Sequence, residues 1–122
     1  MYSHNMVILK GYLPELPLIE STKNGTPVWK YDLKVKTTQK DESGKRVYEW
    51  FHITTYGKTA QDAQTYFRKG DYIEVRGYLK RDTWKKENQF NEKVYVIAQD
   101  IQLLERKEKA FNPDDYADEV SW

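Results

Sequence analysis

Residues 48–79 read YEWFHITTYGKTAQDAQTYFRKGDYIEVRGYL, and the spacing of their apolar side chains changes twice. Over residues 48–56 the side chains alternate between two faces, which is typical of a β-strand. Residues 58–69 instead repeat alanine and aromatic side chains at helical spacing, which predicts a helix of about three turns that stops at Gly70. Strand alternation returns over residues 71–79. The stretch therefore predicts a strand, a helix and another strand in that order.

Further strands are predicted on both sides of this stretch. Residues 5–13 are mainly apolar, and residues 29–36 alternate between apolar and mostly cationic side chains. Residues 40–46 form a polar stretch with a glycine, which is typical of a hairpin connection. Residues 81–92 are predicted to be a charged connection to a last strand at residues 94–104. Five strands with one helix between the third and the fourth is the order of an OB-fold, so we expect a mostly β, five-stranded Greek-key barrel.

Aromatic residues dominate the composition. The 122 residues include ten Tyr, four Trp and four Phe, but no cysteine and only two histidines. This length predicts one domain, and the shortage of Cys and His argues against disulfide frameworks, thiol nucleophiles and the common zinc sites. The first residues lack a basic segment and an apolar run long enough for a signal peptide or a membrane span. We therefore expect a cytoplasmic protein without a cofactor.

The strands also carry rings and cations on the face that alternates with their apolar face. On the strand before the predicted helix these residues are Tyr48, Trp50, His52, Thr54 and Tyr56. On the strand after it they are Tyr72, Glu74, Arg76, Tyr78 and Lys80. The strand at residues 29–36 adds Lys30, Asp32, Lys34 and Lys36. A strand in a small domain has one core to face, so the other face favours a flat ligand, and its cations are compatible with a polyanion.

Enzymatic chemistry finds little support in the sequence. Residues 57–59, Gly-Lys-Thr, match the end of a P-loop, but the glycine that this motif requires earlier would fall at His52. We find no paired-histidine metal site and no nucleophile placed with a base. We therefore expect a protein that is not an enzyme.

The same residues resemble the bacterial and phage single-stranded DNA-binding proteins of the OB-fold class. NMVILKGYL at residues 5–13 is similar to the opening strand of that family, Asn-x-Val-x-Leu-x-Gly-x-Leu. EWFH at residues 49–52 and YGKTA at residues 56–60 resemble its tryptophan strand and helix start. YFRKGD at residues 66–71 and IEVRGYL at residues 73–79 resemble its helix stop and fourth strand. The resemblance covers nearly the whole body of the chain.

This resemblance implies an OB-fold domain over residues 1–106 that binds single-stranded DNA without sequence preference and protects it during replication, recombination or repair. The positions that match base-stacking residues of the family are Trp50, Tyr56 and Trp84. The aromatic strand faces add Tyr48 and Tyr78. The expected phosphate contacts are Lys34, Lys36, Arg76 and Lys80. The family further implies a homo-oligomer, most often a tetramer with a dimer possible, located at the nucleoid.

The end of the chain is expected to be a separate unit. Residues 107–122 are predicted to be a flexible acidic tail, because residues 111–122 contain four acids, no Lys or Arg and no core-facing period. In the family such a tail docks replication and repair partners. The docking residues expected here are Asp118, Glu119, Val120 and Trp122. The ending differs from the family's acids followed by Pro-Phe, so the identity of the partners stays open.

Two other functions stay open at this point. The aromatic face could serve another protein, as in a primosome accessory protein or inhibitor, or it could bind RNA. The small size and divergent tail also suggest a phage or mobile-element origin.

Overall fold

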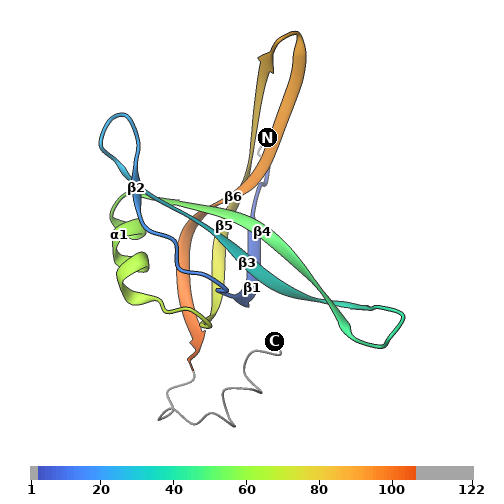
Figure 1. Cartoon of the computed structure of the whole chain (residues 1–122). Helices are drawn as coiled ribbons and strands as arrows, with labels where there is room; N and C mark the ends of the chain where they lie inside the picture. Colours follow the sequence, from blue (N-terminus) through green and yellow to red (C-terminus); the bar gives the residue numbers. More distant parts are fainter. Residues whose placement is uncertain (1–2, 107–122) are drawn as a thin grey trace.

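A computed structural model describes residues 3–106, which form a single sheet and one helix (Figure 1). The elements are β1 (Val7–Tyr12), β2 (Glu20–Ser21), β3 (Pro27–Lys40), β4 (Arg46–Tyr56), α1 (Gly57–Tyr66), β5 (Tyr72–Lys86) and β6 (Gln89–Glu105). The five predicted strands correspond to β1, β3, β4, β5 and β6, and α1 lies between the third and fourth of them as expected. The predicted tail at residues 107–122 lies outside the described residues. Within residues 3–106, no helix is long and apolar enough to cross a membrane.

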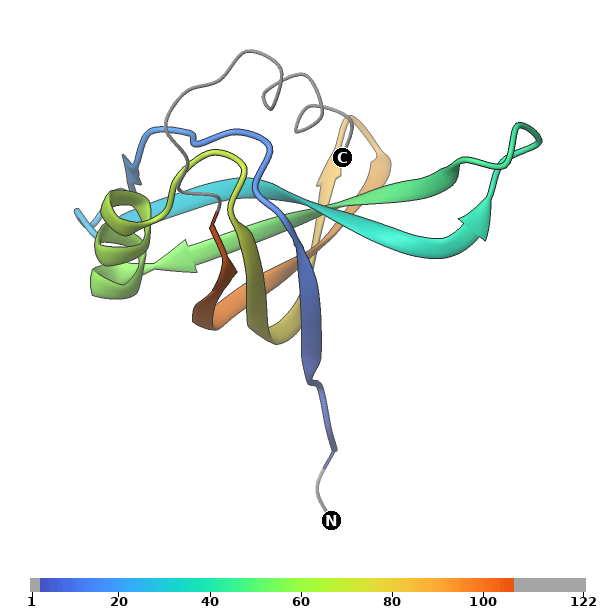
Figure 2. The same ribbon diagram turned by 90° about the horizontal axis from the view of Figure 1, so that it is seen from below.

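The sheet closes into a barrel. Its hydrogen-bonded order is β1-β5-β6-β4-β3-β2, and β1 also pairs with β3. The β4–β6 pair is parallel, whereas the other pairs are antiparallel. Figure 2 shows α1 at one end of the β3–β4 ribbon and the connecting turn of that ribbon at the other. The predicted OB-fold is therefore confirmed.

Two glycines allow neighbouring strands of the barrel to approach closely. A Cβ atom at Gly77 would lie 1.8 Å from the carbonyl oxygen of Ile97, and one at Gly11 would lie 2.5 Å from the carbonyl oxygen of Lys34. Gly77 also follows a shift in the β5–β6 register. Any larger residue at these positions would push β5 away from β6, or β1 away from β3.

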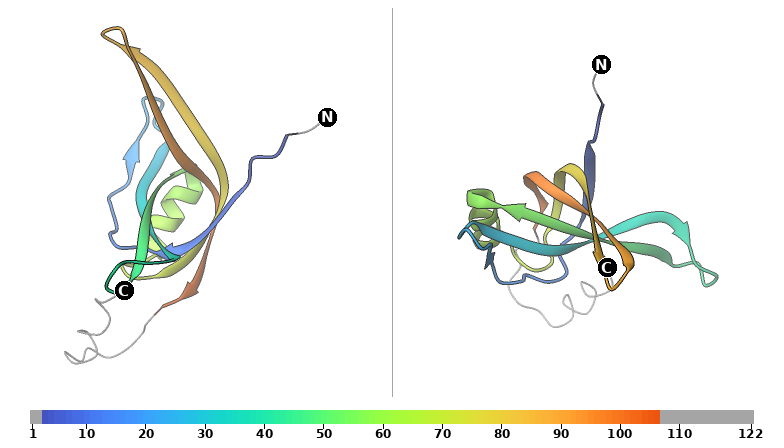
Figure 3. Two further views of the ribbon diagram at one scale, coloured as in Figure 1. Left: turned by 90° about the vertical axis from the view of Figure 1, so that its right-hand side faces the viewer. Right: turned by 90° about the horizontal axis from the view of Figure 1, so that it is seen from above.

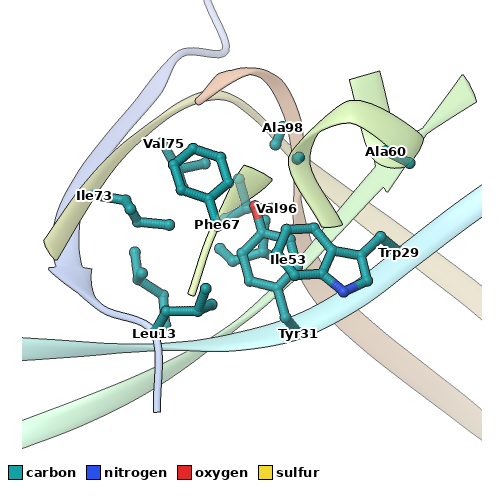
Figure 4. Packing of buried hydrophobic residues seen from close by; sticks show 12 residues of the cluster. Leu13, Trp29, Tyr31, Ile53, Ala60, Phe67, Ile73, Val75, Val96 and Ala98 are labelled. Atoms are coloured by element: carbon teal, nitrogen blue, oxygen red, sulfur yellow. The ribbon is translucent and has the colours of Figure 1, made fainter. Parts of the chain in front are cut away.

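The apolar strand faces and one face of α1 fill the barrel (Figure 4). The buried cluster consists of Leu13, Trp29, Tyr31, Leu33, Ile53, Ala60, Ala63, Phe67, Ile73, Val75, Val96 and Ala98. Trp29 is fully buried, and its ring stacks on Tyr31 with 4.1 Å between centroids. Its Nε1–H donates a hydrogen bond to the carbonyl oxygen of Pro17 at 2.9 Å. This burial agrees with the alternation of residues 29–36, in which Trp29 belongs to the apolar set.

The helix is shorter than predicted. It ends at Tyr66, and the extended backbone of Phe67 takes the next side chain into the core. Tyr66 is 55% exposed, although its spacing had suggested a core position. The N–H of Phe67 makes the last helical hydrogen bond, to the carbonyl oxygen of Ala63. Burying Phe67 beside Ala63 thus ends the helix before Gly70.

A buried ion pair fastens the turn after α1 to the end of β6. Arg106 donates from Nε to Oδ1 of Asp71 at 3.0 Å and from Nη2 to Oδ2 at 2.7 Å. Arg106 Nη2 also donates to the carbonyl oxygen of Tyr66, and the backbone N–H of Arg68 donates to Asp71. The Asp71 side chain is 2% exposed and the Arg106 side chain 12%. Strand and helix periodicity in the sequence does not reveal this role of Arg106.

The prediction of a charged connection over residues 81–92 was wrong. β5 continues to Lys86 and β6 begins at Gln89, so Glu87 and Asn88 form a tight turn with φ values of 51° and 66°. This β5–β6 hairpin extends well past the barrel (Figure 3). Most of its side chains are exposed, which explains why these strand residues are as polar and charged as those of a typical loop.

Candidate nucleic-acid interface

The outer face of β3 and β4 combines cations with aromatic rings. Antiparallel pairing sets these residues directly opposite one another: Lys30 and Thr54, Asp32 and His52, Lys34 and Trp50, and Lys36 and Tyr48. Directly opposed residues project from the same side of a sheet. The lysines predicted from one strand therefore lie beside the rings predicted from the next.

Lys34 lies close to two of these rings. Its Nζ is 4.5 Å from the ring centroid of Tyr48 and 5.7 Å from that of Trp50. Such cation–π contacts are worth about 0.5–1 kcal/mol at exposed sites. Trp50 is nevertheless 53% exposed, so much of its ring surface is open to a ligand.

The β5–β6 hairpin extends this outer surface. Its paired residues on the same side are Tyr78 and Ile97, Lys80 and Tyr95, Asp82 and Lys93, and Trp84 and Asn91. Ile97 also pairs with Thr54 of β4, which places the hairpin residues on the side of the barrel that carries Trp50. Trp84 is 47% exposed.

A groove lies where the two surfaces meet. It is lined by Pro14, Glu15, Pro17, Lys30, Tyr31, Asp32, Trp50, His52, Ile53, Thr54, Lys93 and Tyr95. The hydroxyl of Tyr95 donates to Oδ2 of Asp82 at 2.7 Å. Burial raises the pKa of Tyr95, with further increases from this hydrogen bond, the Asp82 charge and the neighbouring Tyr56. Tyr95 therefore stays a neutral hydroxyl around neutral pH.

The predicted site residues occupy three places. Trp50, Tyr48, Lys34 and Lys36 lie on the outer face of β3 and β4. Tyr78, Lys80 and Trp84 lie on the hairpin. Tyr56, at the end of β4, is 43% exposed and interacts with Tyr95.

Arg76 has different surroundings. Its Nε donates to Oε2 of Glu74 at 2.9 Å, and Lys10 lies 4.0 Å from the other oxygen of this largely buried carboxylate. Arg76 faces Ile8 across the β1–β5 pairing and Asp100 across the β5–β6 pairing. The structure thus places Arg76 outside the groove, with Glu74 offsetting its charge.

Several groove residues were not predicted from the sequence. Lys93 and Tyr95 follow strand alternation, but Lys93 was hidden in the stretch between the predicted strands. The pairing of His52 with Asp32, at 2.6 Å, depends on a strand register that composition does not reveal. Across residues 3–106 no group of three or more His, Asp or Glu side chains could hold a metal ion. The tail residues Asp118, Glu119, Val120 and Trp122 lie outside the described part of the chain.

Comparisons with known proteins agree with this architecture. The model of the single-strand binding protein family matches residues 4–104. The chain is 34% identical over 108 residues to the single-stranded DNA-binding protein of Aquifex aeolicus, covering 87% of this chain and 74% of that protein. It is 32% identical over 106 residues to single-stranded DNA-binding protein A of Bacillus subtilis, covering 84% of this chain and 60% of the relative.

A solved structure extends the comparison to three dimensions. The crystal structure of the single-stranded DNA-binding protein from Thermus aquaticus superposes with a TM-score of 0.71 at 29% sequence identity. The match covers 84% of this chain and 50% of the Thermus chain. Since the family model spans nearly all of the described barrel and the Aquifex relative is 34% identical over 74% of its length, the chain belongs to the single-strand binding protein family.

Proposed function

We propose that the protein binds single-stranded DNA without sequence preference and protects exposed strands during replication, recombination or repair. The observation that carries this proposal is the cross-strand placement of Lys34 beside Tyr48 and Trp50 on an open outer face. The proposed role is non-catalytic. A protein with this role would be located in the cytoplasm, with the DNA of the nucleoid. Membership of the single-strand binding protein family supports the same conclusion.

The bases would stack on exposed rings. Trp50, Tyr56 and Trp84 are the main platforms, and all three are exposed by between 43% and 53%. Tyr48 and Tyr78 are half-buried and extend the platforms along β4 and β5. Stacking on an aromatic side chain contributes about 1–3 kcal/mol per base and tolerates any sequence, because every base has a π-face.

The phosphates would contact the cations beside these rings. Lys34 and Lys36 flank Trp50 and Tyr48, while Lys80 lies on the hairpin. Arg76 would contribute only to a strand that continues past the groove along β5. Each phosphate neutralised in single-stranded DNA changes the slope of log affinity against log salt by about −0.7.

Tryptophan fluorescence during titration with a dT oligomer at several salt concentrations tests this proposal. We expect quenching in the wild type and much weaker binding in a Trp50→Ala, Tyr56→Ala double variant. Phe90→Ala is the matched control, because Phe90 is 69% exposed and projects from the other face of the hairpin than Trp84. Unchanged affinity of the double variant would contradict the stacking mechanism and favour a protein-interaction role. Tighter binding of rU than of dT oligomers would instead indicate an RNA-binding module.

We also propose that the protein acts as a homo-oligomer, a tetramer in the first instance and otherwise a dimer. Within residues 3–106, β1 pairs with β5 along one edge but with β3 only at Tyr12, so most of its other edge has no strand partner. An unpaired strand edge is suited to pairing with a second chain. Light scattering coupled to gel filtration would measure the assembly, and a monomer at all concentrations would contradict this proposal.

The acidic tail completes the proposal. Asp118, Glu119, Val120 and Trp122 would dock replication or recombination proteins. Deleting residues 114–122 should abolish capture of such partners and strengthen DNA binding at low salt, because four carboxylates no longer compete with DNA for the basic face. If neither property changes, the tail has no such role.

A further inference from the structure

His52 and Asp32 form a hydrogen-bonded pair inside the groove. They lie opposite each other on β4 and β3, and Nδ1 of His52 is 2.6 Å from Oδ1 of Asp32. An ionised carboxylate only accepts hydrogen bonds, so Nδ1 of His52 carries a proton and donates a hydrogen bond to Asp32. Within residues 3–106, Nε2 of His52 has no hydrogen-bond partner, and the side chain is 65% exposed. Nε2 is therefore the ring nitrogen open to a ligand.

Because the proton on Nδ1 is held by Asp32, the hydrogen-bonding role of Nε2 depends on whether the ring is neutral or protonated. In the neutral ring Nε2 is an acceptor, and it cannot bond to a phosphate oxygen, which is also an acceptor. In the imidazolium ion Nε2–H is a donor that carries part of a positive charge. Histidine side chains change between these forms at about pH 5 to 8. A phosphate in the groove would therefore bind the protonated ring of His52 and not the neutral one.

The charged groups facing His52 come from several elements. They are Lys30, Asp32 and Lys34 of β3, Lys93 and Tyr95 of β6, Glu15 from the segment before β2, and Asp82 of β5, which reaches the groove through Tyr95. Lysine and carboxylate side chains ordinarily ionise outside the range from about pH 5.5 to 7.5. Tyr95 is also excluded, because burial and Asp82 raise its pKa. Histidine is thus the residue type in this groove whose charge changes in that range.

Because Asp32 is next to His52, the charge of the His52 ring affects how strongly this face attracts phosphates. Its carboxylate lies between Lys30 and Lys34 on the outer face, so it weakens the attraction of that face for phosphates. A protonated His52 offsets this charge at 2.6 Å, whereas a neutral one does not. Trp50 and His52 are two residues apart on β4, about 7 Å along the strand. A phosphate next to a base stacked on Trp50 can therefore reach the His52 ring.

We propose that His52 is a phosphate-contacting residue of the DNA site, that Asp32 positions its ring, and that DNA binding is coupled to proton uptake at His52. This inference rests on the proposed binding of single-stranded DNA. Since one exposed ion pair is added, dT affinity should be about twofold to fivefold higher at pH 5.5 than at pH 7.5. The slope of log affinity against log salt should be steeper at pH 5.5 by about 0.7. Thymine and the phosphodiester do not change charge between these pH values, so the proton is bound by the protein.

Anisotropy of a labelled dT oligomer at three pH values and three salt concentrations measures both effects. Calorimetry in two buffers with different ionisation enthalpies measures the proton uptake directly. His52→Gln should remove the pH dependence of dT binding and the proton uptake that accompanies it. Asp32→Asn should bind more tightly than the wild type at pH 7.5, because it removes a carboxylate from the face. His4→Gln is the matched control, because His4 is the only other histidine and is not among the residues that line the groove.

The outcomes separate this inference from the proposed function. If the wild type binds dT but His52→Gln keeps the full pH dependence, His52 is not the coupled group and the DNA-binding proposal stands. Loss of the pH dependence in His4→Gln would contradict the inference in the same way. If the wild type fails to bind dT at every pH, the proposed function itself is wrong.

Discussion

Replacing Arg106 with alanine should destabilise the barrel far more than replacing any exposed arginine. Arg106 donates two hydrogen bonds to Asp71 and a third to the carbonyl oxygen of Tyr66. Without them, the only hydrogen bond that residues 3–106 still give the Asp71 carboxylate, which is 2% exposed, comes from the backbone N–H of Arg68. Leaving a buried charge without its partner costs about 3–5 kcal/mol. Because Arg106 itself is slightly exposed, we expect a loss of about 3–4 kcal/mol.

Thermal unfolding followed by circular dichroism measures this loss. In a domain of about 100 residues each kcal/mol shifts Tm by about 4–8 °C, so Arg106→Ala should lower Tm by at least about 12 °C. The Tm of Arg106→Lys should lie between those of Arg106→Ala and the wild type, because an ammonium group cannot reproduce the bidentate contact of the guanidinium with Asp71. Arg81→Ala is the control, since Arg81 pairs with Glu92 at 2.6 Å but both side chains are largely exposed. That exposed pair contributes less than about 1 kcal/mol. Equal losses of Tm in Arg81→Ala and Arg106→Ala would refute the reasoning.

Three further predictions concern the barrel and the interface. Gly77→Ala should destabilise the domain by about 3 kcal/mol or more, because its Cβ would lie 1.8 Å from the carbonyl oxygen of Ile97; a wild-type Tm would contradict this. Trp84→Ala should weaken dT binding about 5-fold to 150-fold in a fluorescence titration, since one stacked base is lost, whereas Phe90→Ala should change it less than about twofold. Lys34→Gln should make the salt slope of dT binding shallower by about 0.7, and an unchanged slope would show that Lys34 meets no phosphate.

The fold could be predicted from local periodicity because each core strand has one buried face. Trp29 and Leu33 show this most clearly, since both are fully buried and alternate with polar residues. The same criterion failed for residues 81–92, where the hairpin leaves the barrel and neither face is buried. Helical spacing likewise failed at Tyr66, which is exposed: the helix ends there, and the extended backbone of Phe67 takes that side chain into the core.

The sequence could predict which residues lie on the interface, but it could not predict which of them contact one another. Strand parity placed Trp50 and Tyr56 on one face and Lys34 on a cationic face before the pairing of the strands was known. Only the register shows that Lys34 lies against Trp50 and that Asp32 meets His52. Arg76 shows the limit of parity, because it shares a face of β5 with Tyr78 yet bonds to Glu74 beside β1.

The position of Arg106 also bears on how the chain folds during synthesis. The β3–β4 hairpin is local and can form early, but the barrel closes through β4 and β6, which are far apart in sequence. The guanidinium that neutralises Asp71 belongs to the residue just after β6. A nascent chain therefore carries an unneutralised carboxylate at the turn after α1 until its last strand has been made. Closure of the barrel and burial of Asp71 become favourable together, so partly synthesised chains gain little from closing too soon.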